Sequence, residues 1–107
     1  MKIFDKFKKS NEIIENDNTY MTVLDCFSIK NVGVVAVCII EEGEIKLNDT
    51  VQINGVVDTI VAIEYDKQIL KSAESGMMVG ILLKNIQKSD VVAGEKISKV
   101  WLQIFYV

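Results

Sequence analysis

Three residue types are missing from this chain of 107 residues, and each absence excludes a class of chemistry. There is no His, which removes Ser–His and Cys–His nucleophile pairs and imidazole metal ligands. There is no Arg, because all 12 basic residues are Lys, so no guanidinium fork can grip a phosphate or a guanine. There is no Pro, as expected where most of the chain lies in paired strands. The sequence predicts a protein that is not an enzyme and has no metal site and no cofactor.

Cysteine and long apolar runs are scarce as well. Cys26 and Cys38 lie in apolar segments at a spacing typical of neither a zinc site nor a CxxC redox pair. We expect both to be buried thiols in a reducing cytoplasm. No apolar run approaches the roughly 18 residues that span a bilayer, and the first ten residues lack the apolar core of a signal peptide. The sequence predicts one cytoplasmic domain without an integral membrane segment, and its wealth of Ile, Lys and Asn is typical of an AT-rich bacterial genome.

What the chain has in abundance is β-branched apolar residues, with 15 Ile and 14 Val. Apolar or alternating runs are separated by polar turn residues, and Asn54-Gly55 between two of them is a strong hairpin signal. The segment from Met77 to Leu83 is apolar nearly throughout, which predicts a strand buried on both faces. The expected strands are residues 20–29, 32–40, 51–53, 56–65, 77–83 and 97–107. Together they indicate an all-β barrel or sandwich.

The N-terminal residues differ in character from the rest. Residues 1–9 carry a net charge of +3, from four Lys against one Asp, and three apolar residues that share one face of a helical turn: Ile3, Phe4 and Phe7. They could dock on an anionic membrane surface or in a partner's groove, or form a leader that frays or packs on the domain. The polar residues 10–18 are predicted to be a linker without regular structure. The predicted division is a leader and linker over residues 1–18 and a barrel with an extra C-terminal strand over residues 19–107.

A series of short sequence motifs occurs in a fixed order along residues 20–99. They are Phe27-Ser28-Ile29, Gly33, Glu41-x-Gly43-x-Ile45, Asn48-Asp49-x-Val51, Ile63-Glu64, Ala73-x-x-Gly76-x-x-Val79-Gly80-Ile81-x-Leu83, Ile86 and Asp90-Val91-Val92-x-Gly94-Glu95-x-Ile97. In this order they resemble domain 2 of the translational GTPases, the β-barrel that follows the GTPase domain in elongation factor Tu. The resemblance implies a small closed antiparallel barrel. Because the chain has no Gly-x-x-x-x-Gly-Lys-Ser/Thr loop, we expect a free-standing barrel that binds no GTP.

In elongation factor Tu this barrel also supplies half of the pocket for the aminoacyl end of tRNA. The resemblance places that pocket at Asp25 and Phe27, which match the family's motif of two acids, one residue and Phe. The family's other polar positions are aliphatic here: an acid is replaced by Leu24, a basic residue by Val32, a threonine by Val37 and an asparagine by Met78. The net charge of −3 also disfavours contact with a phosphate backbone. We expect this lip to contact a protein, and RNA or ribosome binding is the less favoured alternative.

The C-terminal run from Val100 to Val107 extends past the usual end of the family's barrel. It holds three of the eight aromatic residues: Trp101, Phe105 and Tyr106. An apolar strand of this kind can join its own barrel, with Trp101 or Phe105 covering one end, or pair with a second copy or another protein. The sequence predicts a non-catalytic protein-interaction module, and the alternative is a translation- or ribosome-associated factor that keeps some RNA contact through its lysines.

Overall fold

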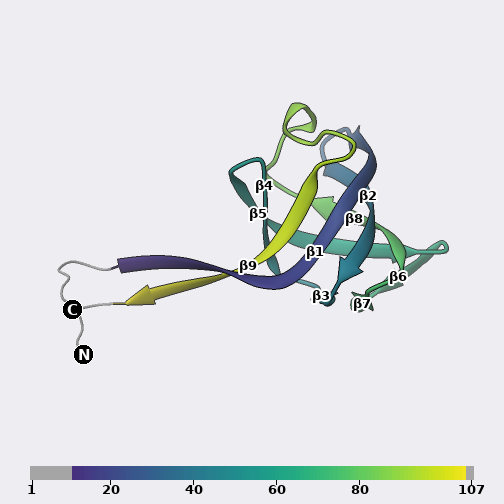
Figure 1. Ribbon diagram of the computed structural model, residues 1–107. Helices are drawn as coiled ribbons and strands as arrows, with labels where there is room; N and C mark the ends of the chain where they lie inside the picture. The colour runs from purple at the N-terminus through teal and green to yellow at the C-terminus, as the bar shows by residue number, and fades with distance from the viewer. Residues whose placement is uncertain (1–10, 106–107) are drawn as a thin grey trace.

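The computed structural model describes the backbone of residues 11–105 and the side chains of residues 18–101. Within this part the chain is almost entirely strand (Figure 1). In chain order the elements are β1 (Asn11–Ile29), β2 (Gly33–Glu42), β3 (Glu44–Lys46), β4 (Thr50–Ile53), β5 (Val56–Tyr65), β6 (Gln68–Leu70), β7 (Ser72–Glu74), β8 (Met78–Leu83), the 3₁₀ turn η1 (Lys88–Asp90) and β9 (Lys96–Phe105). No helix in the described part has the length and apolar character needed to cross a membrane.

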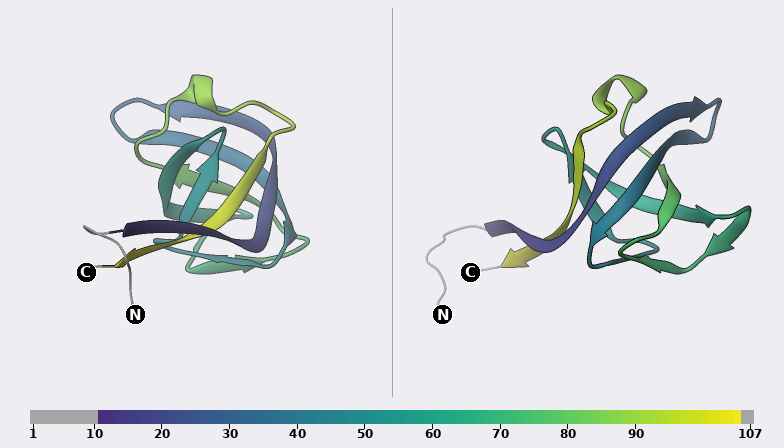
Figure 2. Two further views of the ribbon diagram at one scale, coloured as in Figure 1. Left: turned by 60° about the vertical axis from the view of Figure 1, so that its left-hand side comes forward. Right: turned by 45° about the vertical axis from the view of Figure 1, so that its right-hand side comes forward.

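Six strands close into an antiparallel barrel, as the sequence and the resemblance predict. The sheet order is β4-β9-β1-β2-β8-β5, and β5 pairs back with β4 to complete the circle. Figure 2 shows the closed wall from two sides, with β6 attached to β5 as an extension of the sheet. Strands β3 and β7 form a separate two-stranded sheet.

Side chains at alternate positions of the strands point inward and fill the barrel. In β2 every second residue is buried, from Val34 to Ile40, and the core is completed by buried aliphatic residues from the other barrel strands. The predicted hairpin is confirmed: Asn54 and Gly55 have φ of 50° and 79° between β4 and β5. Two positive φ values are what a two-residue hairpin turn with the correct twist requires. Gly43 also has a positive φ of 82°, and a Cβ there would collide with the Thr19 side chain.

The prediction of an irregular linker at residues 10–18 is wrong for the described residues from Asn11 onward. They are the first half of β1 and pair with the end of β9, from Asn11 opposite Phe105 to Asn16 opposite Val100. The two segments form a ribbon that projects from the barrel (Figure 1). A shift in the β1–β9 register between Asn16 and Tyr20 marks where the ribbon leaves the barrel. The polar residues are ordered because a partner strand from the far end of the chain satisfies their backbone groups.

The expected strand at residues 77–83 is present as β8, but it is not buried on both faces. Val79, Ile81 and Leu83 point into the core, whereas Met78 is 55% exposed and Leu82 is half-buried. Apolar residues therefore lie on the outside of the barrel at this strand, a feature that periodicity alone does not distinguish from complete burial.

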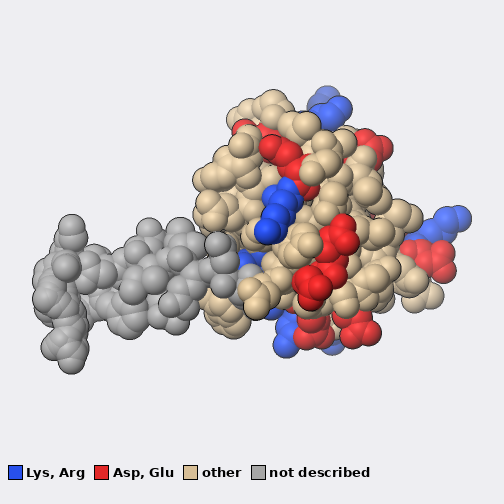
Figure 3. Space-filling model, viewed as in Figure 1, with Lys and Arg blue, Asp and Glu red and all other residues tan. Residues whose placement is uncertain are grey.

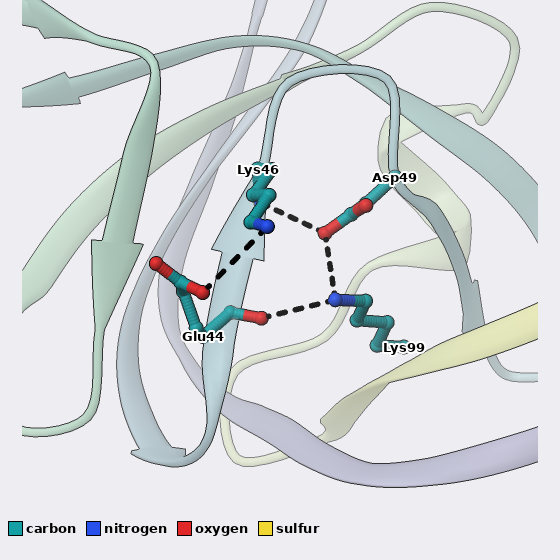
Figure 4. A network of polar contacts seen from close by, with 4 residues as sticks. All are labelled: Glu44, Lys46, Asp49 and Lys99. Atoms are coloured by element: carbon teal, nitrogen blue, oxygen red, sulfur yellow. Dashed lines mark hydrogen bonds and ion pairs between the residues drawn. The ribbon is translucent and has the colours of Figure 1, made fainter.

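A small polar network holds the barrel closed where β4 meets β9, a pairing of only two register positions. The Lys99 ammonium lies 3.2 Å from Asp49 Oδ2 and donates to the Glu44 carbonyl oxygen at 3.3 Å (Figure 4). Asp49 Oδ2 also accepts the Lys46 backbone N–H at 2.7 Å. The Lys99 and Asp49 side chains are only 12% and 18% exposed, so water screens this pair less than it screens a surface pair.

A second buried carboxylate fixes the loop after β8. Asp58, on β5, is 3% exposed and accepts backbone N–H groups from Thr59, Asn85 and Ile86 at 2.7, 2.8 and 2.7 Å. Each of these bonds supplies an acceptor to a backbone N–H group that has little access to water. Asp58 therefore determines how the chain turns from β8 toward η1.

Replacing Lys99 with Met is expected to lower the free energy of unfolding by about 1–2 kcal/mol, because Asp49 loses its charged partner in a half-buried site. Lys46→Met is the matched control, since Lys46 makes only an exposed 3.9 Å ion pair with Glu44. Its effect should stay within about 0.5 kcal/mol. Urea unfolding measures both, and equal effects would contradict this role for Lys99.

Asp58→Ala is expected to cost about 2–4 kcal/mol, because it leaves buried backbone donors without an acceptor. Asp25→Ala is the control: the Asp25 carboxylate also accepts the next residue's N–H, at 2.8 Å, but it is exposed. A loss below about 1 kcal/mol is expected for Asp25→Ala. Chemical denaturation of both variants tests the difference, and comparable losses would refute the assignment.

Candidate functional site

The outer surface of β2 departs from the pattern of a soluble barrel. Between its buried residues lie Val35, Val37 and Ile39, which point outward and are half-buried. Outward positions of an antiparallel sheet that faces water are usually polar. Here all three are β-branched and apolar, so the same strand is aliphatic on both faces.

Strand register extends this apolar surface over the neighbouring strands. Val35 lies between Phe27 of β1 and Leu82 of β8, and Ile39 lies opposite Met78 of β8. We call this surface the outer apolar face. Its members are Phe27, Val35, Val37, Ile39, Met78 and Leu82.

The centre of the outer apolar face carries no side chain. Gly80 pairs with Val37 on one side and with Glu64 of β5 on the other. A Cβ added at Gly80 would lie 3.4 Å from Val35 Cγ1, which is an ordinary contact. Neighbouring atoms therefore do not require a glycine at this position. Because Gly80 has no side chain, the sheet backbone there is open to an approaching group.

Acidic groups border the face. Asp25, opposite Val37, and Glu64, opposite Gly80, are both exposed. Glu41 is exposed at the end of β2 and accepts the Thr22 hydroxyl at 2.8 Å. The outer apolar face with its acidic border can bind a partner whose own apolar surface carries positive charge at its rim.

The structure brings together several of the residues that the sequence singled out. Asp25 and Phe27 share the face with Val37 and Met78, two of the positions where the family's polar residues are aliphatic. Phe27 is 45% exposed. Val32 and Leu24 are exposed too, at the β1–β2 turn and at a register shift in β1.

Trp101 is not part of this face. It pairs with Glu15 near the start of β1, whereas Phe27 lies near the end of that strand. It is 54% exposed, with the Lys99 ammonium 5.7 Å from its ring centre, so it does not cover an end of the barrel. The other predicted contact residues fall outside the described side chains: Phe105, Tyr106, Ile3, Phe4 and Phe7.

Sequence reasoning missed Val35, Ile39 and Leu82 as surface residues. The signal was present, because the uninterrupted apolar run of β2 cannot direct every side chain into one core. Such a run indicates a strand, but it does not show which of its residues face outward.

The two cysteines differ, contrary to the expectation that both are core thiols. Cys38 is fully buried, and desolvation raises the pKa of its thiol from 9.0 to about 12. Cys26 is half-buried, with Sγ 3.6 Å from the Val91 carbonyl oxygen. Among the described residues no group of three His, Cys, Asp or Glu side chains is placed to hold a metal ion.

Comparison with known proteins shows which family the barrel around this site belongs to. The family model for elongation factor Tu domain 2 matches residues 33–98. The chain belongs to the elongation factor Tu domain 2 family. It is similar to the apicoplast elongation factor Tu of Plasmodium falciparum, with 41% identity over 85 residues, which cover 74% of this chain and 21% of that protein.

Two solved structures carry the same barrel. The apo form of translation elongation factor SelB from Methanococcus maripaludis superposes with a TM-score of 0.71 and 21% identity, over 81% of this chain and 20% of SelB. A bacterial selenocysteine-specific elongation factor, EF-Sec, gives a TM-score of 0.71 and 25% identity, over 76% of this chain and 14% of that one. This elongation factor Tu domain 2 chain thus spans about a fifth or less of the length of these relatives.

The buried Cys38 thiol makes the stability of the domain depend on alkaline pH. Because the folded-state pKa is raised, the contribution of Cys38 is fully present below pH 9.0 and is lost as the pH rises toward about 12. Between about pH 8 and about pH 10 the wild type should lose about 1 kcal/mol more unfolding free energy than Cys38→Ala. Urea unfolding at both pH values tests this. A Cys38→Ala curve parallel to the wild type would contradict it.

Proposed function

We propose that this domain is a non-catalytic module that binds a protein partner in the cytoplasm through the outer apolar face. The observation that supports the proposal is the row of aliphatic and aromatic residues on the outside of three adjacent strands, centred on Val37 and Gly80. Apolar side chains that point away from the core contribute less to the stability of the barrel than core side chains do. Their grouping on one surface is typical of a protein interface.

The chemistry of the partner follows from the border of the face. Asp25 and Glu64 flank the apolar centre, so the partner should present apolar side chains with Lys or Arg at its rim. The open backbone at Gly80 favours a partner that inserts one side chain there, and the mobile thioether of Met78 can adapt to its shape.

The alternative function is that of a translation- or ribosome-associated factor with residual RNA contact. It is supported by similarity to known proteins, because the relatives named above are elongation factors. The charges favour it less: in Figure 3 the lysines of the described surface stand apart with acidic groups among them, and they form no continuous basic patch on that face. Strong binding to a phosphate backbone depends on clustered positive charge.

Met78→Lys tests the function, because it puts a charge on the outer apolar face at a side chain that is 55% exposed and not needed by the core. Val57→Lys is the matched control, an exposed valine of β5 that pairs with Gln52 of β4, away from the face. In nuclease-treated extract the wild type and Val57→Lys should retain the same protein, and Met78→Lys should lose it.

Two results would contradict the proposal. One is retention of the protein by Met78→Lys. The other is a partner that disappears with nuclease, together with binding that weakens steeply as salt is added, which would support the RNA alternative.

A further inference from the structure

The absence of a side chain at position 80 is not explained by the needs of the fold. Gly80 has no positive φ, unlike the other five glycines of the chain, so its backbone conformation suits any residue. A Cβ there would make only an ordinary contact, 3.4 Å from Val35 Cγ1. Neither strain nor crowding therefore requires a glycine, and Gly80 remains partly exposed in the outer apolar face.

Strand register gives Gly80 four neighbours of two kinds. Val37 of β2 and Glu64 of β5 lie opposite it on its two sides. Met78 and Leu82 lie before and after it on the same face of β8. Directly opposite residues have their Cβ atoms about 4.5–5.5 Å apart. A side chain placed over Gly80 by a partner would thus meet three apolar neighbours and one carboxylate.

The apolar surface continues beyond Glu64. Ile69 of β6 lies opposite Glu64 and is 72% exposed. Glu64 therefore lies between Gly80 and an apolar side chain, in a row across the sheet that begins with Val37. A partner that covers this row removes water from the carboxylate, which costs free energy unless the partner supplies a matching charge.

The Glu64 carboxylate is also the least engaged of the acidic groups near the face. Asp25 accepts the Cys26 N–H at 2.8 Å, and Glu41 accepts the Thr22 hydroxyl at 2.8 Å. Among residues 18–101, whose side chains are described, none forms a hydrogen bond or an ion pair with the Glu64 carboxylate. Both of its oxygens are therefore available to a group that the partner provides.

We propose that the outer apolar face recognises one Lys or Arg side chain of its protein partner, whose aliphatic stem lies over Gly80 and whose charged end pairs with Glu64. This inference rests on the proposed function, and it assigns the selection of the partner to these two residues. The stem of a Lys or Arg side chain packs against apolar groups while its charged end reaches a polar one. A purely apolar side chain at the same place would leave the Glu64 carboxylate desolvated and unpaired, so the site discriminates against it.

The experiment selects ligands from a phage library of short random peptides, with the full chain immobilised and RNA absent. The wild type should enrich peptides in which Lys or Arg stands among apolar residues, and Glu64→Lys should not retain them. In solution a selected peptide should bind Glu64→Gln and Gly80→Ala at least about tenfold more weakly than the wild type. Glu74→Gln is the matched control, because Glu74 is exposed on β7, which pairs only with β3, and it should bind like the wild type.

Circular dichroism confirms that each variant is folded. Selected peptides that are apolar and lack Lys and Arg would overturn this inference, and the proposed function would still stand if Met78→Lys lost them. Equal binding by the wild type, Glu64→Gln and Gly80→Ala would also overturn it, as would an equal loss in Glu74→Gln. So would a library that yields no enriched peptide, whereas the proposed function is judged separately by the protein retained from extract.

Discussion

The closure of the barrel between β4 and β9 is the constraint on which the other features depend. Only two register pairs join these strands, and the nearly buried contact of Lys99 with Asp49 strengthens the seam at its end. Asp49 in turn holds the β3–β4 turn by accepting the Lys46 N–H. Without this seam the six-stranded wall would be an open sheet whose aliphatic core faces water.

The same seam divides β9 into two parts with different partners. Up to Lys99 the strand lies between β1 and β4 and contributes Ile97 to the core. After Lys99 the pairing with β4 stops near the first residue of β4, and β9 pairs only with the first part of β1. The ribbon forms because the 19 residues of β1 extend beyond the barrel wall and pair with the part of β9 that has no partner in β4.

The local parts of the fold could be predicted from the sequence, because local chemistry determines them. Asn54-Gly55 specifies its own turn, because both residues readily adopt the positive φ that the turn requires. The pairing of Asn11 with Phe105 is different. Asn- and Glu-rich residues form a strand there only because a distant apolar strand lies beside them, and no local pattern contains that information.

The candidate site was predictable in part for a related reason. Asp25 and Phe27 could be located through the family's motif, but the contributions of Val35 and Leu82 require the register of three strands. Complete burial of β8 was the natural prediction from an apolar run, and it failed because a closed barrel has only one interior. An aliphatic strand in such a wall must expose one set of its side chains. The informative residues are thus those that are apolar on the outside.

The outer apolar face and the ribbon lie on opposite halves of β1, and this arrangement has a consequence for binding. Phe27 and its neighbours occupy the end of the strand, whereas the ribbon begins at Asn11, so pairing at the ribbon would not cover the outer apolar face. The outer apolar face therefore stays open to a partner whatever the ribbon contacts.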